Sequence, residues 1–109
     1  MQIPLEISFQ DMGHSDTVET SVRERVAKLE QLSNEITSCH VFISAPHKNH
    51  QKGNLFEVRI EVRVPGTELA VSNNPGDIHA HEDAYVAIRD AFDAMQRQIK
   101  KWKQQRKHH

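Results

Sequence analysis

The feature that most constrains the fold is a nine-residue alternation near the middle of the chain. Phe56, Val58, Ile60, Val62 and Val64 are separated by single charged residues, two glutamates and two arginines. Successive side chains of a β-strand point to opposite faces, so the pattern predicts a strand with one apolar and one charged face. Such a strand needs partner strands beside it and an apolar layer over only one face.

Three further segments show the same period of two and are predicted to be strands. Residues 3–9 alternate apolar and polar, and Pro4 among them indicates a sheet edge or the start of a strand. Residues 36–44 have an apolar side, and a Pro-Gly turn after the central strand leads into residues 68–72. Two polar segments are expected to be loops: 45–54 and 73–77.

Two segments follow the helical period instead. Ser15 or Asp16 can cap the first helix, with Glu19 close to a capping-box position, and the helix should end near Leu32. The second helix should begin near Asp83, and its apolar residues fall within an arc of about 120° if each residue advances about 100°. We expect its buried stripe to comprise Ala84, Tyr85, Ile88, Ala91, Phe92, Met95, Ile99 and Trp102.

The resulting element order is β-α-β-β-β-α, which predicts an α+β fold. Because every strand is amphipathic, one four-stranded sheet with two helices packed on one face covers all the apolar surfaces. A chain of 109 residues can bury one hydrophobic core, so we expect a single domain over residues 1–109. His108 and His109 are set aside, because a purification tag leaves the same residues.

The sequence contains no signal for secretion, membrane insertion or catalysis. No leader peptide and no apolar run long enough to span a bilayer is present, which predicts a cytoplasmic protein without a membrane partner. The single cysteine, Cys39, lies in an apolar strand and should be a buried thiol. Neither GxSxG nor a Gly-rich phosphate loop occurs, so we expect no enzyme, no cofactor and no small-molecule substrate.

Charge is segregated along the chain. Residues 1–93 hold 8 Lys/Arg and 15 Asp/Glu, whereas residues 94–109 hold 6 basic residues and no acid. A cation in the last helical turn suits the macrodipole, but six cations exceed that need and predict a polyanionic partner. On the first helix, Arg25 and Lys28 lie on one flank and would reinforce the basic end.

Folded RNA fits this charge distribution better than single-stranded RNA. Tyr85 and Trp102 are both assigned to the buried stripe, so aromatic side chains on which unpaired bases could stack are scarce. Binding should therefore depend on the shape and phosphates of folded RNA and weaken as salt rises.

Histidines provide an alternative function. His47 and His50 are three residues apart in the first polar segment, and His79 and His81 precede two acids. Imidazoles and carboxylates can hold a divalent ion, which would make the protein a metal-binding sensor or enzyme. Since neither a cysteine pair nor HExxH accompanies them, we expect no metal site, and His79 and His81 would be secondary contacts to the polyanion.

The two predicted helices resemble those of a known family. The last helix carries the frame D-x-Y-x-A-I-x(4)-D-x(3)-R-Q-I-x-K over residues 83–101. Residues 21–30, SVRERVAKLE, are similar to the pattern A-L-R-E-x-V-x-x-K-L. Both motifs resemble the ribosome hibernation promoting factors, also called ribosome-associated inhibitors, ribosomal subunit interface proteins or sigma-factor modulation proteins. Together with the element order, the resemblance covers nearly the whole chain.

This resemblance implies a domain that binds the small ribosomal subunit, contacts 16S-type rRNA in the channel for mRNA and tRNA, and blocks translation during stress or stationary phase. Basic residues on the two helices make the family's contacts, so Lys28, Arg97 and Lys101 would contact phosphates. Arg89 departs from the family, which usually has an acid there, and adds positive charge. The expected RNA-binding residues are Arg25, Lys28, Arg89, Arg97, Lys100, Lys101 and Lys103.

Other departures limit what the resemblance implies. Segments 45–54 and 73–81 are longer than in short family members, so loop contacts do not transfer. The sequence does not include the additional C-terminal domain that long members use to pair ribosomes, so it is either a short-type factor or a truncated longer chain, and the sequence alone does not separate the two.

Overall fold

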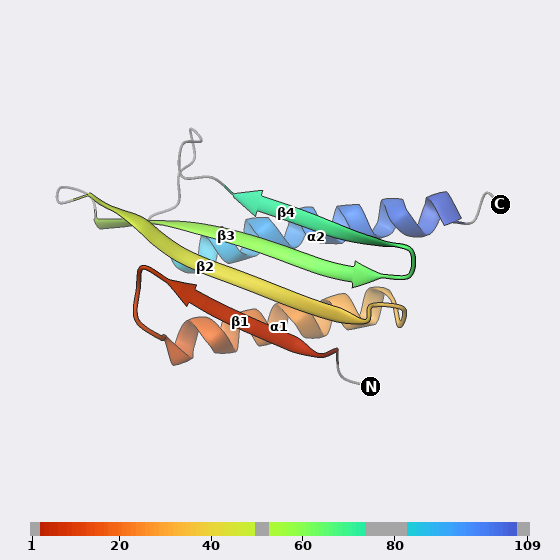
Figure 1. Cartoon of the computed structure of the whole chain (residues 1–109), viewed down its shortest axis with the longest axis horizontal. Helices are drawn as coiled ribbons and strands as arrows, with labels where there is room; N and C mark the ends of the chain where they lie inside the picture. The colour runs from red at the N-terminus through yellow and green to blue at the C-terminus, as the bar shows by residue number, and fades with distance from the viewer. Residues whose placement is uncertain (1–2, 50–52, 74–82, 107–109) are drawn as a thin grey trace.

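The computed structural model describes residues 3–49, 53–73 and 83–106. Four strands form one sheet in the order β1-β2-β3-β4, and both helices cover the same face of it (Figure 1). The elements are β1 (Leu5–Gln10), α1 (Asp16–Leu32), β2 (Ser38–Asn49), β3 (Gly53–Val64), β4 (Thr67–Asn73) and α2 (Ala84–Arg106). The predicted α+β class and element order are confirmed.

Strand pairing follows from the connections. β1 pairs parallel with β2, because α1 returns the chain to the end of the sheet where β1 began. β2, β3 and β4 pair antiparallel, and β1 lies at the edge, as Pro4 indicated. The turn between β3 and β4 contains Pro65 and Gly66, and Gly66 has φ +86°, a value that glycine adopts without strain.

The core lies between the sheet and the helices. Every second residue of β3 faces it, and Val58, Ile60, Val62 and Val64 are at most 2% exposed. Their cross-strand partners in β2 face the same side, so the two central strands form a continuous apolar surface. These partners are Cys39, Val41 and Ile43, which are likewise at most 2% exposed.

The predicted loop over residues 45–54 is wrong. β2 continues to Asn49 and β3 begins at Gly53, with Lys48 opposite Asn54 and a register shift between Ser44 and His47. A β ladder needs only backbone amides and carbonyls, so polar residues can extend a hairpin past the helices that cover its apolar part (Figure 1). The second predicted loop covers residues 73–77. Asn73 is the last residue of β4, and residues 74–77 lie outside the described chain.

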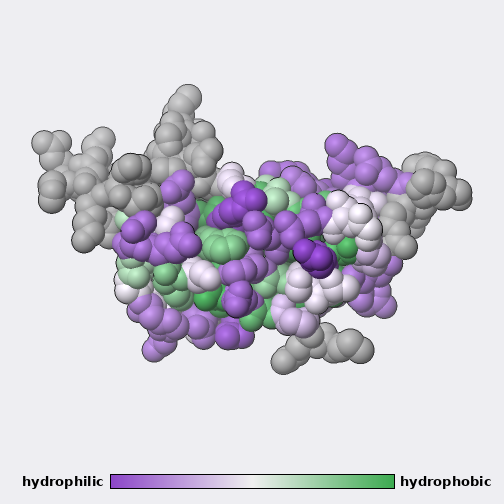
Figure 2. Space-filling view, in the orientation of Figure 1, coloured by the Kyte–Doolittle hydropathy of each residue, from purple (hydrophilic) through white to green (hydrophobic). Residues whose placement is uncertain are grey.

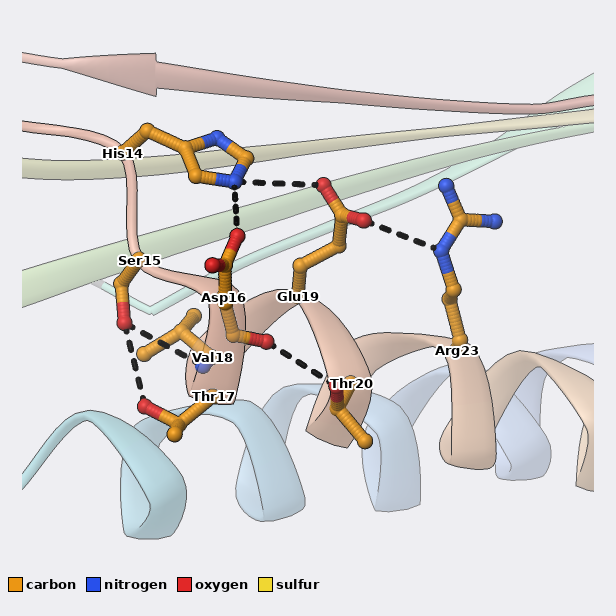
Figure 3. A network of polar contacts seen from close by, with 8 residues as sticks. All are labelled: His14, Ser15, Asp16, Thr17, Val18, Glu19, Thr20 and Arg23. Atoms are coloured by element: carbon orange, nitrogen blue, oxygen red, sulfur yellow. Dashed lines mark hydrogen bonds and ion pairs between the residues drawn. The ribbon is translucent and has the colours of Figure 1, made fainter.

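Ser15, one of the two predicted caps, is the N-cap of α1 (Figure 3). The Ser15 hydroxyl accepts a hydrogen bond from the backbone N–H of Val18 over 3.3 Å. Glu19 takes no part in a capping box. Its carboxylate instead accepts from Arg23 Nε at 3.3 Å and lies 3.7 Å from His14 Nε2.

α2 is rotated relative to the prediction. Tyr85, assigned to the buried stripe, is 47% exposed, and Ala87 is fully buried in its place. Small side chains at Ala84, Ala87 and Ala91 let that side of the helix approach the sheet closely, which turns the opposite rim of the stripe toward water. The remaining predicted stripe residues are buried.

The two helices lie side by side and run in the same direction, so their C-terminal ends meet at one end of the domain (Figure 1). There Lys103 Nζ donates a hydrogen bond to the carbonyl oxygen of Leu32 over 2.6 Å. α1 has no basic residue in its own last turn, so Lys103 supplies the cation that the negative end of its dipole favours. On the other flank of α2, Gln98 Nε2 donates to the carbonyl of Ala70 in β4 at 3.3 Å.

Replacing Lys103 by Met should lower the free energy of unfolding by about 1–2 kcal/mol, because a charge-assisted hydrogen bond to a helix C-terminus is lost. Urea denaturation measures the loss. Lys101→Met is the matched control, since Lys101 is exposed, and its effect should stay within about 0.5 kcal/mol. Equal losses in the two variants would contradict the role of Lys103.

Burial raises the pKa of the Cys39 thiol to about 12. The folded protein should therefore resist Ellman's reagent at pH 8 and react once unfolded in urea. Above the ordinary thiol pKa of 9.0, the unfolded chain loses this proton while the folded one keeps it, so stability should fall as pH rises. The unfolding free energy of wild type minus that of Cys39→Ala, followed from pH 8 to about pH 10.5, isolates this contribution. If this difference in unfolding free energy stays constant over the pH range, the thiol does not contribute to the pH dependence of stability.

Candidate nucleic-acid interface

Most of the predicted RNA-binding residues lie on the outer surface of the two helices. At about 100° per residue, Arg97, Lys100 and Lys101 lie within about 70° of the direction opposite the buried stripe of α2. All three are exposed. Since α2 covers the sheet with its stripe, these side chains point away from the sheet.

α1 contributes to the same surface. Arg25 and Lys28 lie on the flank of α1 opposite Glu30, whose carboxylate accepts a hydrogen bond from Ile3 N beside β1. That flank therefore faces α2, on the side where Lys103 reaches Leu32. We call the combined group the helix-face cluster: Arg25, Lys28, Arg97, Lys100, Lys101 and Lys103.

The cations of the cluster have no carboxylate at ion-pair distance in the described part of the chain. Lys103 donates a hydrogen bond to the Leu32 carbonyl and so is already engaged within the domain. The C-terminal halves of α1 and α2 thus present a concentrated positive charge to solvent, which suits a polyanion.

Arg89 is separate from this cluster. It lies eleven residues before Lys100, about 16 Å along the helix axis. Its guanidinium is 3.1 Å from the carboxylate of Asp90, and both groups are solvent-exposed. The structure therefore places Arg89 in the N-terminal half of α2, with an acid beside it.

The outer face of the sheet has a different charge arrangement. The strands lie in front of the helices in Figure 1, and the same view of the surface in Figure 2 shows hydrophilic and hydrophobic areas intermingled. Arg59 pairs with Glu61 at 2.9 Å, and Arg63 lies 3.6 Å from Glu68. Since each arginine here has a carboxylate partner, this face is less suited to a polyanion than the helix face.

One polar constellation on the sheet was missed by the sequence reasoning. His40 Nε2 lies 2.8 Å from Ser8 Oγ, and His40 Nδ1 lies 3.0 Å from Glu6 Oε2. The order resembles a nucleophile, a base and an acid, and only strand register brings the three together. However, strand amides lie in the sheet plane and do not point over the face, where an oxyanion would need donors. The His40 ring also stacks on Phe42, with centroids 3.8 Å apart, which indicates a cross-strand packing network.

A hollow of about 860 Å³ beside the end of α1 is chemically unlike the helix-face cluster. Its charged lining residues are Glu30 and Glu35, and no Lys or Arg lines it. A polyanion would be repelled there.

The histidines proposed for a metal site are not placed by the structure. His50, His79 and His81 lie outside the described residues, and for His47 only the backbone, in β2, is described. In the described part of the chain, no group of three or more His, Cys, Asp or Glu residues could hold a metal ion.

Tyr85 is a second feature that the sequence reasoning missed. It is the one large apolar side chain among the described residues that is exposed. Its place at the rim of the apolar arc was the only available signal, and periodicity cannot decide which rim is covered.

In the described ranges, neither helix is long and apolar enough to cross a membrane.

Comparison with known proteins agrees with this architecture. The ribosome hibernation promotion factor of Deinococcus radiodurans is 26% identical over 104 residues, which are 94% of this chain and 50% of that protein. The chain thus spans about half the length of this curated relative. The N-terminal domain of Thermus thermophilus protein Y superposes with a TM-score of 0.69 at 21% identity, covering 94% of this chain and 99% of that domain. A ribosomal subunit interface protein from Coxiella burnetii gives 0.74 at 14% identity, covering 93% of this chain and 98% of that one.

The family assignment rests on a match to nearly the whole chain. Residues 5–107 match the family described as sigma 54 modulation protein / S30EA ribosomal protein, which confirms the resemblance seen in the helix motifs. The match spans both helices and all four strands. The chain therefore belongs to the sigma 54 modulation protein / S30EA ribosomal protein family.

Proposed function

We propose that this protein is a translation inhibitor that binds the small ribosomal subunit and promotes ribosome hibernation under stress or in stationary phase. Its helix face contacts 16S-type rRNA in the channel that mRNA and tRNA use. The site of action is the cytoplasm, where ribosomes translate. Family membership supports the ribosome as partner, as do the names of the Deinococcus and Coxiella relatives.

The observation that carries the proposal is the helix-face cluster. Six cations lie on one side of the domain, and in the described residues none is paired with a carboxylate. Duplex and folded RNA present phosphates at regular spacing, and each neutralised phosphate releases counterions. Because the cluster is held on two packed helices, binding to the phosphate backbone does not require a flexible tail to become ordered, and the entropy cost of that ordering is avoided.

The mechanism is occlusion. Binding through phosphates fixes the position of a folded domain, and the domain excludes mRNA and tRNA from the space it occupies. No bond is made or broken, so inhibition reverses when the protein dissociates.

Lys100→Glu combined with Lys101→Glu should weaken association with purified small subunits by at least about tenfold, because phosphate contacts are replaced by repulsion. Co-sedimentation through sucrose gradients at a series of salt concentrations measures this. Wild-type affinity should fall steeply with salt, and the logarithmic slope of the variant should be shallower by about two.

The matched control is Arg23→Glu combined with Arg63→Glu, which changes the net charge equally but lies on the β1 flank of α1 and on the outer sheet face. It should bind like wild type. Circular dichroism verifies that both variants are folded. Equal weakening in both variants, or wild-type association insensitive to salt, would reject the helix face as the RNA-binding surface.

A further inference from the structure

Tyr85 occupies an unusual position for the one tyrosine of the chain. A tyrosine on an amphipathic helix normally buries most of its ring, whereas this one is 47% exposed while its neighbours Ala84 and Ala87 are buried. Its backbone is well fixed, since Tyr85 N–H donates to Asp83 Oδ1 over 2.8 Å. The ring is therefore presented to solvent from the rigid first turn of α2.

The exposed ring lies on the flank of α2 that faces the RNA-binding surface. At about 100° per residue, Tyr85 and Lys103 project in nearly the same direction, and Lys103 reaches α1. Arg89 follows one turn after Tyr85, about 6 Å along the axis, and projects within about 40° of it. The ring thus lies at one end of a flank that carries Arg89, Lys100 and Lys103.

The local charge favours a base over a phosphate at this position. The carboxylate of Asp83 lies at the start of α2, where it accepts from the backbone N–H of Tyr85, and its negative charge disfavours a phosphate nearby while its oxygens can accept hydrogen bonds from the amino groups of bases. Arg89 lies 3.1 Å from the exposed Asp90 carboxylate, and it would exchange this surface pair for the phosphate of an adjoining nucleotide. An aromatic face, an acceptor and a cation one turn away together match one unpaired nucleotide.

We propose that Tyr85 is a base-stacking site, at which one unpaired nucleobase of the bound RNA packs on the exposed ring while Arg89 contacts its backbone. The inference rests on the proposed function and deepens it. The protein contacts the helical phosphates of the RNA through the helix-face cluster and anchors an unstacked nucleotide at the start of α2. Stacking of this kind tolerates any base, because every base has a π-face.

Tyr85→Leu is the first test, because leucine keeps apolar bulk but removes the aromatic face. Affinity for small ribosomal subunits should fall about tenfold, in the range typical for loss of one stacked base. Tyr85→Phe should remain within about twofold of wild type. Both changes replace an exposed side chain, so the thermal midpoint of unfolding should stay close to that of wild type.

Salt dependence separates stacking from charge. Tyr85→Leu should lower affinity at every salt concentration and leave the logarithmic slope unchanged, whereas Lys100→Ala should make the slope shallower by about one. If Tyr85→Leu binds small subunits as tightly as wild type while the Lys100/Lys101 charge reversal loses binding, the stacking site is overturned and the proposed function is retained. No salt-sensitive binding by the wild type would overturn both.

A cross-linking experiment identifies what touches the ring. With p-benzoylphenylalanine at position 85 in the full chain, near-ultraviolet irradiation of the complex with small subunits should attach the protein to rRNA. Cross-linking to a ribosomal protein instead would overturn the proposal in favour of a protein contact at Tyr85.

Discussion

One face of the sheet is apolar along its two central strands, and α1 and α2 are the elements that cover it. The inward residues of β2 and β3 are almost completely buried beneath the helices. Burial of this surface is the main favourable contribution to folding, and it can occur only with both helices on the same side. Both C-terminal helix ends then lie together, and every polar surface of the domain must be either the outer side of the helices or the far face of the sheet.

These two surfaces have opposite electrostatic arrangements. On the sheet, cross-strand neighbours lie about 5 Å apart, so Arg63 of β3 finds its β4 partner Glu68, and Arg59 and Glu61 pair along β3 itself. In α2 the acids Asp90 and Asp93 precede the cations of the last turns, and within the described chain no member of the helix-face cluster has a carboxylate partner. Unpaired like charges repel one another and add no stability, which is typical of a surface kept for a charged partner. Lys103 is an exception that serves both purposes, because it also ties α2 to the last carbonyl of α1.

Much of the fold could be predicted because hydrophobic periodicity reports directly which side of an element is buried. The alternation in β3 and the caps and stripes of the helices indicated the elements and their order, and the helix motifs indicated the family. The hairpin formed by β2 and β3 was predicted too short, since polar residues can continue a backbone ladder without leaving an apolar signal. The Ser8, His40 and Glu6 network was also invisible, because it depends on the pairing of strands far apart in the sequence.

The sequence by itself determined which residues are apolar, in what period they recur and where positive charge gathers, and these properties decide the elements and the basic end of α2. Only the tertiary structure decided how α2 is rotated on the sheet, and therefore that Ala87 is buried and Tyr85 exposed. It also decided that Arg25 and Lys28 of α1 lie on the flank beside the basic end of α2. Local patterns specify a stripe to within about one side chain on each rim, and the fit of small and large side chains against the sheet selects the final rotation.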